Sequence, residues 1–186
     1  MRTRDSEKQQ RIKEAMVRLI LEEGMGGASV SKIAREAGVS PATIYIYYTS
    51  KEEMISEVFR EYSHKSYHYL LRQIRPEMSG ADLIDTIVRS SYRYFVENEE
   101  IFSFVEQCSH CPTISGSVQE AECCGGVFEL MHHYQELGIV RHLSDMNLSA
   151  VLFAPVKFLA MNRGRSAHMQ EELSELSAML QRLLLN

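Results

Sequence analysis

A short stretch of the chain brings together hydroxyl groups and a cation that suit the binding of phosphate. Thr43, Tyr45 and Tyr47 alternate along it, and Lys51 follows. On a helix the three hydroxyl residues fall within about a turn and a half, and their short or rigid side chains lose little entropy when they donate to a phosphate oxygen. Lys51 would add its charge at the start of the next helix. The alternative is that the tyrosines are core or interface aromatics, and the position of Tyr48 indicates that its ring does face inward.

The residues just before this stretch predict a helix-turn-helix. Ser29 can cap a helix that ends at Ala37, and Ser40 can cap the next one, with Pro41 in its first turn. Gly38 stands in the turn, where a residue that tolerates positive φ is needed. The small residue at the helix crossing is Ala34. The apolar residues that lock the second helix against the first are Ile33, Val39 and Ile44. Such a unit presents its second helix to the major groove of DNA.

With these features in place, the segment SVSKIAREAGVSPATIYIYYTSKEEMI resembles the DNA-binding segment of the TetR/AcrR family. The family pattern is Ile-Ala, Ala-Gly-Val-Ser, then Thr, an aliphatic residue, Tyr, any residue, an aromatic residue or His, an aromatic residue and, two residues on, Lys. The matching residues are Ile33, Ala34, Ala37, Gly38, Val39, Ser40, Thr43, Ile44, Tyr45, Ile46, Tyr47, Tyr48 and Lys51. The motif covers roughly the first quarter of the chain, and beyond it only the order and length of the helices agree.

The resemblance implies two sets of DNA contacts. Phosphates would be held by Thr43, Tyr45, Tyr47 and Lys51, and base edges or backbone would be approached by Ser40, Pro41 and Ala42. Ile46 stands at the variable position and can offer only an apolar contact, such as one to a thymine methyl. The family's inward Phe is Tyr48 here, and a buried hydroxyl would need a partner. Arg2 and Arg4 would reach a minor groove, or else belong to a disordered terminus.

The hydrophobic pattern predicts an all-α protein. It comprises an N-terminal three-helix helix-turn-helix domain over residues 1–50 and a C-terminal helical domain over residues 51–186 for effector binding and dimerisation. Apolar residues at helical spacing from Ile12 predict a first helix that Gly24 with Gly26 and Gly27 would end, and Ser50 with Glu53 predicts a capping box on the fourth. After a linker around Pro76, helices are expected over residues 81–97, 99–109, 115–137, 145–162 and 168–185.

Composition and charge narrow the classes of function. The chain has 186 residues, 45% of them apolar, and no apolar run approaches the roughly 20 residues of a membrane span, so we expect a cytoplasmic protein with no membrane partner. Residues 1–51 carry nine Lys/Arg and six Asp/Glu, whereas the remainder carries eleven and nineteen. A basic head on an acidic body concentrates phosphate contacts at one end, which argues against an architectural protein that wraps DNA non-specifically.

Aromatic and methionine side chains in the second half predict an effector pocket between the middle helices, as the resemblance also implies. Such a lining would suit an apolar or aromatic small molecule, although residues of this kind at helical spacing more often pack as core. Polar candidates are included because a titratable group on an apolar helix needs a reason to be there. The predicted lining is Tyr92, Phe95, Phe102, Glu106, Phe128, Met131 and His132.

Four cysteines raise the hypothesis of a different sensor. Cys108, Cys111, Cys123 and Cys124, with nearby histidines, would supply the thiolates and imidazoles that a metal or an oxidant requires. A single CxxC is weak evidence for zinc, and adjacent cysteines on a helix point about 100° apart. Inert buried thiols or pocket lining are therefore favoured, with no metal site and no cofactor.

Together these features predict a homodimeric, ligand-responsive repressor that leaves a pseudo-palindromic double-stranded operator when a small molecule binds. Repression is what the resemblance implies. The last two helices carry apolar stripes that would pair with their two-fold copies in a four-helix bundle. The stripes comprise Leu148, Val151, Leu152, Phe158 and Leu159, and then Leu173, Leu176, Met179, Leu180, Leu183 and Leu184. The rival class is a helical enzyme with a DNA-binding head, but the chain has no nucleophile elbow, phosphate loop, HExxH motif or spaced carboxylate pair, so we predict no enzymatic activity.

Overall fold

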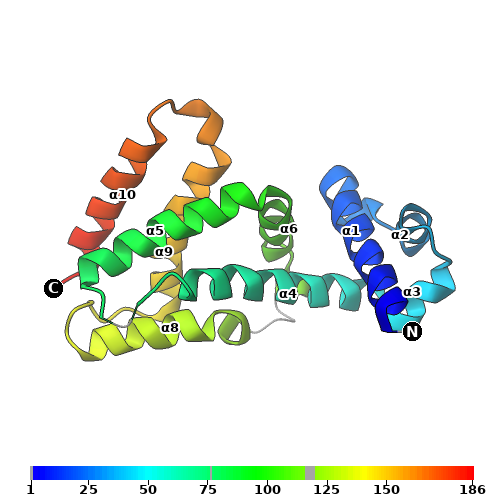
Figure 1. The fold of residues 1–186 in the computed structure, drawn as a ribbon, viewed down its shortest axis with the longest axis horizontal. Coiled ribbons are helices and arrows are strands. Elements are labelled where there is room, and N and C mark those ends of the chain that lie inside the picture. The colour runs from blue at the N-terminus through cyan, green and yellow to red at the C-terminus, as the bar shows by residue number, and fades with distance from the viewer. Residues whose placement is uncertain (1, 76, 116–119) are drawn as a thin grey trace. The chain divides into compact units, whose positions relative to one another are not determined.

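The computed structural model describes residues 2–75, 77–115 and 120–186, with side chains for all of these except 2–4, 115 and 120–125. The elements are α1 (Arg2–Gly27), α2 (Val30–Ala37), α3 (Pro41–Tyr47), α4 (Lys51–Leu71), α5 (Gly80–Glu97), α6 (Glu99–Ser109), α7 (Pro112–Ser115), α8 (Glu120–Glu136), α9 (Asp145–Met161), the 3-10 helix η1 (Arg163–Arg165) and α10 (Met169–Leu184) (Figure 1). The predicted all-α fold is confirmed. In the described ranges no helix combines the length and the apolar character that crossing a membrane requires.

Serine caps set several helix boundaries where the sequence predicts them. α2, α3, α5 and α9 each begin one residue after a serine whose side chain accepts a hydrogen bond from a backbone N–H of the first turn. The four caps are Ser29, Ser40, Ser79 and Ser144. A free N–H at a helix start needs an acceptor, and a serine oxygen supplies one at short range. The predicted starts of these helices are correct to within one residue.

Two boundaries differ from the sequence-based expectation. α1 begins at Arg2, well before the first apolar residue of the stripe at Ile12, because its first turns have no apolar face and hydrophobic periodicity gives no signal there. Gly24, with φ 76° and ψ 171°, interrupts α1, and the helix ends at Gly27, the last of the three glycines predicted to stop it. Of the helix predicted over 115–137, α8 covers Glu120–Glu136, the short α7 ends at Ser115, and residues 116–119 lie outside the described ranges.

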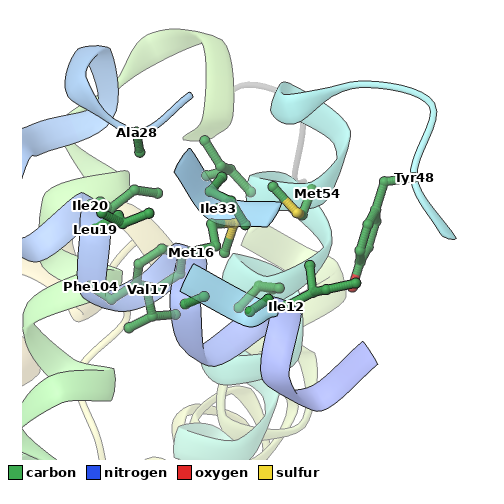
Figure 2. Close-up of a cluster of buried hydrophobic side chains, with 14 of the residues drawn as sticks. Ile12, Met16, Val17, Leu19, Ile20, Ala28, Ile33, Tyr48, Met54 and Phe104 are labelled. Atoms are coloured by element: carbon green, nitrogen blue, oxygen red, sulfur yellow. The ribbon is translucent and has the colours of Figure 1, made fainter. Parts of the chain in front are cut away.

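The chain divides into two compact units, of which the first comprises Met1–Ser63 and Glu99–Gln119. Within it α1 packs on α2 and α6, and α2 packs on α3. A single hydrophobic core runs through this unit, and Figure 2 shows its side chains turned toward one another. Contributions come from α1, α2, α4 and α6 and include Ile12, Met16, Ile33, Met54 and Phe104. Apolar burial by four helices therefore fixes the frame on which α3 is mounted.

The second unit comprises His64–Asn98 and Glu120–Asn186. α5 packs along both α9 and α10, and an isolated antiparallel bridge joins Val140 to Leu185 beyond the last helix. The helix α4 supplies residues to both units. The functional boundary between residues 50 and 51 stays a prediction.

The apolar stripes of α9 and α10 divide into an inner and an outer set. Members of the predicted dimer stripes that are buried in the core of their own unit are Leu148, Leu152, Leu173, Leu180 and Leu184. Large apolar side chains that stay at least half exposed on the two helices are Met146, Phe158, Met161, Met179 and Leu183. Phe158, Met179 and Leu183 of this exposed set belong to the predicted stripes, whereas Met146 and Met161 do not.

Candidate DNA-binding site

The turn between α2 and α3 has the geometry that a helix-turn-helix requires. Gly38 adopts φ 65° and ψ 40°, and its N–H donates to the Arg35 carbonyl at 3.2 Å. The Val39 N–H donates to the Ala34 carbonyl at 2.9 Å, which completes the C-cap of α2. The left-handed conformation favours glycine because a Cβ there crowds the backbone. The predicted positive φ at Gly38 is confirmed.

The start of α3 is ordered by its own polar residues. Ser40 Oγ accepts a hydrogen bond from the Thr43 N–H at 3.2 Å and lies 2.9 Å from Thr43 Oγ1. Pro41 occupies the first helical turn, where no N–H is needed. Ser40, Pro41 and Ala42 are exposed, and Thr43 is half-buried. The predicted residues thus form one accessible, rigid edge at the N-terminal end of α3.

The inner side of α3 is anchored by apolar contacts. Ile44 is 1% exposed, and Ile33 and Ala34 of α2 are equally buried, while Val39 packs against the same core. The sequence predicts these roles: Ala34 is the small residue at the helix crossing, and the other three residues pack the second helix against the first. A larger side chain at Ala34 would meet this packed interior, where extra methylenes cost about 1–3 kcal/mol.

The outer side of α3 presents large side chains to solvent. Tyr45 is 56% exposed and Ile46 is 77% exposed. Such exposure of two large side chains next to each other on a helix of seven residues is not explained by packing within the chain. The surface they form has a hydroxyl that can reach phosphate and an aliphatic side chain that can meet a base only through van der Waals contact.

Tyr47 has a partner that the sequence did not suggest. Its hydroxyl donates to Asp5 Oδ1 at 2.6 Å and lies 3.5 Å from the Asp5 carbonyl oxygen. The hydrogen bond to the Asp5 carboxylate is the main reason that the pKa of Tyr47 is raised, because this bond stabilises the protonated phenol. Asp5 lies in the part of α1 that the apolar stripe could not detect, so sequence reasoning missed it.

Lys51 also makes a contact within the head. Its Nζ donates to the Met25 carbonyl at 3.0 Å, near the C-terminal end of α1. A lysine at a helix C-terminus satisfies a carbonyl that has no intrahelical partner. The ammonium group carries two further protons, so this contact is compatible with a phosphate contact at the start of α4. Met25 gives no chemical signal in the sequence, because its backbone oxygen is the atom that binds.

The N-terminus of α4 is capped in a shifted form of the predicted box. Ser50 Oγ accepts from the Glu53 N–H at 3.0 Å, as predicted. Glu53 Oε2 also accepts from the backbone N–H and the hydroxyl of Thr49, one residue before the cap. These hydrogen bonds lower the pKa of Glu53, since they favour its ionised form.

Tyr48 faces inward, as predicted from its position. The ring is 2% exposed, and its hydroxyl oxygen is buried without a hydrogen bond of normal geometry among the described residues. Burial is the largest effect on the pKa of Tyr48 and raises it, while the nearby Gln9 side chain acts in the opposite direction. Gln9 is therefore the polar side chain near the buried hydroxyl, although no hydrogen bond of normal geometry joins them. Figure 2 shows the ring at the edge of the core.

The remaining predicted residues of the DNA-binding set are the N-terminal arginines. The backbone of Arg2 and Arg4 belongs to α1, but their side chains lie outside the described part of the structure. The predicted minor-groove contact of Arg4 stays a prediction.

The residues of the predicted effector pocket fall into both units. Phe102 and Glu106 belong to α6 of the first unit, whereas the other five lie on α5 and α8 of the second. Met131 is fully buried, and Tyr92 is half-buried. His132 is exposed, and its Nε2 lies 2.6 Å from Asp145 Oδ1 at the start of α9. Phe95, Phe102 and Phe128 are buried, and their role in a pocket stays a prediction.

The cysteines that the structure describes do not resemble a sensor. Cys108 is fully buried, and desolvation, with a smaller effect of Cys111, raises the pKa of its thiol to about 12. A protonated thiol is a poor metal ligand and a slow nucleophile. No group of three or more metal-ligating side chains occurs within the described ranges. The side chains of Cys123 and Cys124 lie outside them.

Comparison with known proteins agrees with this geometry. Residues 12–58 match the family model described as bacterial regulatory proteins of the tetR family. The whole chain is similar to the crystal structure of a TetR family transcription regulator from Marinobacter aquaeolei VT8, with a TM-score of 0.84, 25% sequence identity and coverage of 100% of both chains. An HTH-type transcriptional regulator of Haemophilus influenzae is 25% identical over 150 residues, which cover 78% of this chain and 77% of that protein.

A further relative matches over a shorter stretch. The fatty acid metabolism regulator protein of Bacillus subtilis is 43% identical over 54 residues, which cover 29% of this chain and 28% of that protein. Fold, exposed recognition helix and similarity together define a helix-turn-helix transcriptional regulator that binds DNA. Residues 12–58 form a tetR-family domain, and the chain as a whole is similar to TetR-family transcription regulators.

Proposed function

We propose that the chain is a homodimeric repressor that holds a pseudo-palindromic double-stranded operator through two copies of α3 and releases it when a small molecule binds. The observation that carries the DNA-binding part is the outward face of α3, on which Tyr45 and Ile46 are 56% and 77% exposed. A major groove offers phosphates to the Tyr45 hydroxyl and thymine methyls to Ile46. Ser40, Pro41 and Ala42 at the start of the same helix would approach base edges.

The dimer in this proposal rests on the outer apolar set of α9 and α10. Phe158 and Met161 lie about one turn apart on α9, and Met179 and Leu183 lie about one turn apart on α10. Their exposed fractions are 64%, 66%, 58% and 51%. Pairing of the two helices with their two-fold copies would bury these side chains in a four-helix bundle, whereas a monomer would leave them in water.

The effector is proposed to be an apolar or aromatic small molecule among the side chains of the middle helices. Tyr92, Phe95, Phe128 and Met131 support this choice, because they bring aromatic and thioether surface to α5 and α8 of one unit. The Bacillus subtilis relative matches only 29% of this chain, so the choice of ligand does not rest on its name.

The mechanism we propose is a change in the spacing of two heads. Paired half-sites must lie near whole helical turns, roughly 34 Å each, so a ligand that alters the spacing weakens binding to the pair. An effector that favours the DNA-incompetent state some tens-fold supplies about 2 kcal/mol of coupling, which is enough for release. The proposal includes no catalytic step, and it includes a cytoplasmic location where the protein meets chromosomal DNA.

Selection of binding sites from a random double-stranded library tests this proposal. We expect the wild-type protein to enrich a short inverted repeat. Tyr45→Phe, which removes one hydroxyl from an exposed side chain, should weaken binding about fivefold to tenfold for all sequences, as the loss of a phosphate contact does. Ile46→Ala should instead relax the preference for thymine at one position of each half-site.

The control variant is Tyr69→Phe, which removes a hydroxyl in the second unit and should leave the selected sequence and the affinity unchanged. Lys51→Ala is a poor first test because Lys51 also holds the Met25 carbonyl. If the folded wild-type protein enriches no sequence, the proposed function is wrong.

A further inference from the structure

The hydrogen bond between Asp5 and Tyr47 connects two helices that both belong to the DNA-binding head. Asp5 lies in the first turn of α1 and Tyr47 in the last turn of α3, and the oxygen-to-oxygen distance is 2.6 Å. That distance is typical of a hydroxyl that donates to an ionised carboxylate. Asp5 is exposed and Tyr47 is half-buried, so the contact lies at the surface where solvent or another acceptor can enter.

The chemistry of the two groups makes this contact incompatible with one of the proposed DNA contacts. A phenol carries one proton and can donate it to one acceptor at a time, and a phosphate oxygen in DNA is an acceptor only. Tyr47 therefore cannot donate to Asp5 and to a phosphate together. In addition, a carboxylate within hydrogen-bonding distance of the hydroxyl repels a phosphate that approaches the same position.

We propose that Asp5 competes with a DNA phosphate for the Tyr47 hydroxyl. The Asp5–Tyr47 hydrogen bond then belongs to the DNA-free protein, and DNA binding proceeds by exchange: Tyr47 leaves the carboxylate and donates to a phosphate, while Asp5 is returned to water. Asp5 is in this account a residue that lowers operator affinity. The inference rests on the proposed DNA-binding function.

The opposite role for Asp5 predicts the opposite sign. If Asp5 orients the Tyr47 ring for its phosphate contact, removal of the carboxylate weakens DNA binding, because the hydroxyl is no longer positioned. If the carboxylate acts only through its charge, its removal strengthens binding to the same extent whether or not position 47 carries a hydroxyl. A double-mutant cycle separates the three cases.

The experiment measures the dissociation constant of the full-length protein for its selected operator duplex at one stated salt concentration. The variants are Asp5→Ala, Asp5→Asn, Tyr47→Phe and the double variant Asp5→Ala with Tyr47→Phe. Glu7→Ala is the matched control, because it removes one exposed carboxylate from the same helix without a partner on α3. Thermal unfolding of each variant verifies that the head is folded.

We expect Asp5→Ala to tighten operator binding about threefold to fivefold when Tyr47 is present, which is the scale of an exposed charged contact. In the Tyr47→Phe background, the gain in affinity from Asp5→Ala should be no larger than the gain from the control Glu7→Ala. Asp5→Asn should give an intermediate gain, since its amide oxygen still accepts a weaker hydrogen bond. Weaker binding by Asp5→Ala, or an equal gain in both backgrounds, would overturn the inference. A wild-type protein that selects no operator would instead overturn the proposed function itself.

Discussion

At the scale of single residues, the Tyr48 hydroxyl is a polar group buried at an apolar core. Its oxygen has lost its hydration, and among the described residues no hydrogen bond of normal geometry replaces it, although the Gln9 side chain lies near. Tyr48→Phe should therefore raise the free energy of unfolding by about 1 kcal/mol, as measured by chemical denaturation. Tyr134→Phe is the matched control: the Tyr134 hydroxyl donates to the Met78 carbonyl at 2.8 Å, so its removal should destabilise the protein by a similar amount. Loss of stability in Tyr48→Phe would show that the hydroxyl has a partner.

Cys108 provides a pH-dependent prediction at the same scale. Its pKa of about 12 means that the folded protein keeps the thiol protonated well above the ordinary value of 9.0. Alkylation of Cys108 by iodoacetamide, mapped by mass spectrometry, should be slow in native protein from pH 7 to pH 9 and fast after unfolding. Because the unfolded chain releases this proton first, the stabilising contribution of the buried thiol is present below pH 9.0 and is lost as the pH rises further. Fast native alkylation at pH 7 would revive the thiol-sensor hypothesis.

How far single residues could be predicted depends on the kind of atom that binds. The roles of Gly38, Ser40 and Ile44 follow from backbone conformation, capping and burial, and each of these has a strong residue preference. The contact of Lys51 with the Met25 carbonyl and that of Tyr47 with Asp5 could not be predicted, because both join residues far apart in the sequence through a backbone atom or an exposed carboxylate. No local pattern encodes such pairs.

At the scale of elements, the turn between α2 and α3 is the feature on which the head depends. Gly38→Ala should lower the free energy of unfolding by about 1–2 kcal/mol, because its φ of 65° is strained for any residue with a Cβ. Space is not the cause, since the nearest side-chain atom, Arg11 Nη1, would lie 3.6 Å from the new Cβ. Gly26→Ala in α1 is the control: it has negative φ and open space and should be neutral or stabilising. An equal response of the two variants to denaturant would contradict the assigned backbone strain.

Elements with an apolar stripe and a cap were predictable, and elements without them were not. α2, α3 and α6 have the predicted bounds because capping residues or turns delimit a clear helical period. The first turns of α1 are polar on all sides, and α7 is a four-residue helix, so neither produces a period that can be detected. The stripes on α9 and α10 were found, but apolar periodicity alone could not divide them into inner and outer sets.

At the scale of the whole molecule, the account requires a dimer through α9 and α10. Phe158→Glu should convert the protein to a monomer at micromolar concentration, because it places a charge in the centre of the proposed bundle. Analytical ultracentrifugation measures this. Leu137→Glu is the matched control, since Leu137 is 57% exposed, close to the 64% of Phe158, but lies outside the two helices. A Phe158→Glu variant that remains dimeric would show that another surface carries the association.

The all-α architecture was predictable at this scale, and the arrangement of an effector site was not. Helical periods, caps and a linker determine the order of helices, and the motif in the head determines its local geometry. Most of the residues predicted to line a pocket are apolar side chains that also suit a core, and whether a core residue borders a ligand depends on cavities that no sequence pattern specifies.

The measurement that tests the central claim most directly is binding of the purified protein to its selected operator with altered half-site spacing. Insertion of roughly five base pairs, about half a helical turn, turns the two half-sites to opposite faces of the duplex, and insertion of roughly ten restores them. The account predicts at least a tenfold, about 1.4 kcal/mol, loss of affinity for the half-turn insertion and partial recovery for the full turn. Equal affinity for all three duplexes would contradict a dimer that reads two half-sites with paired α3 helices.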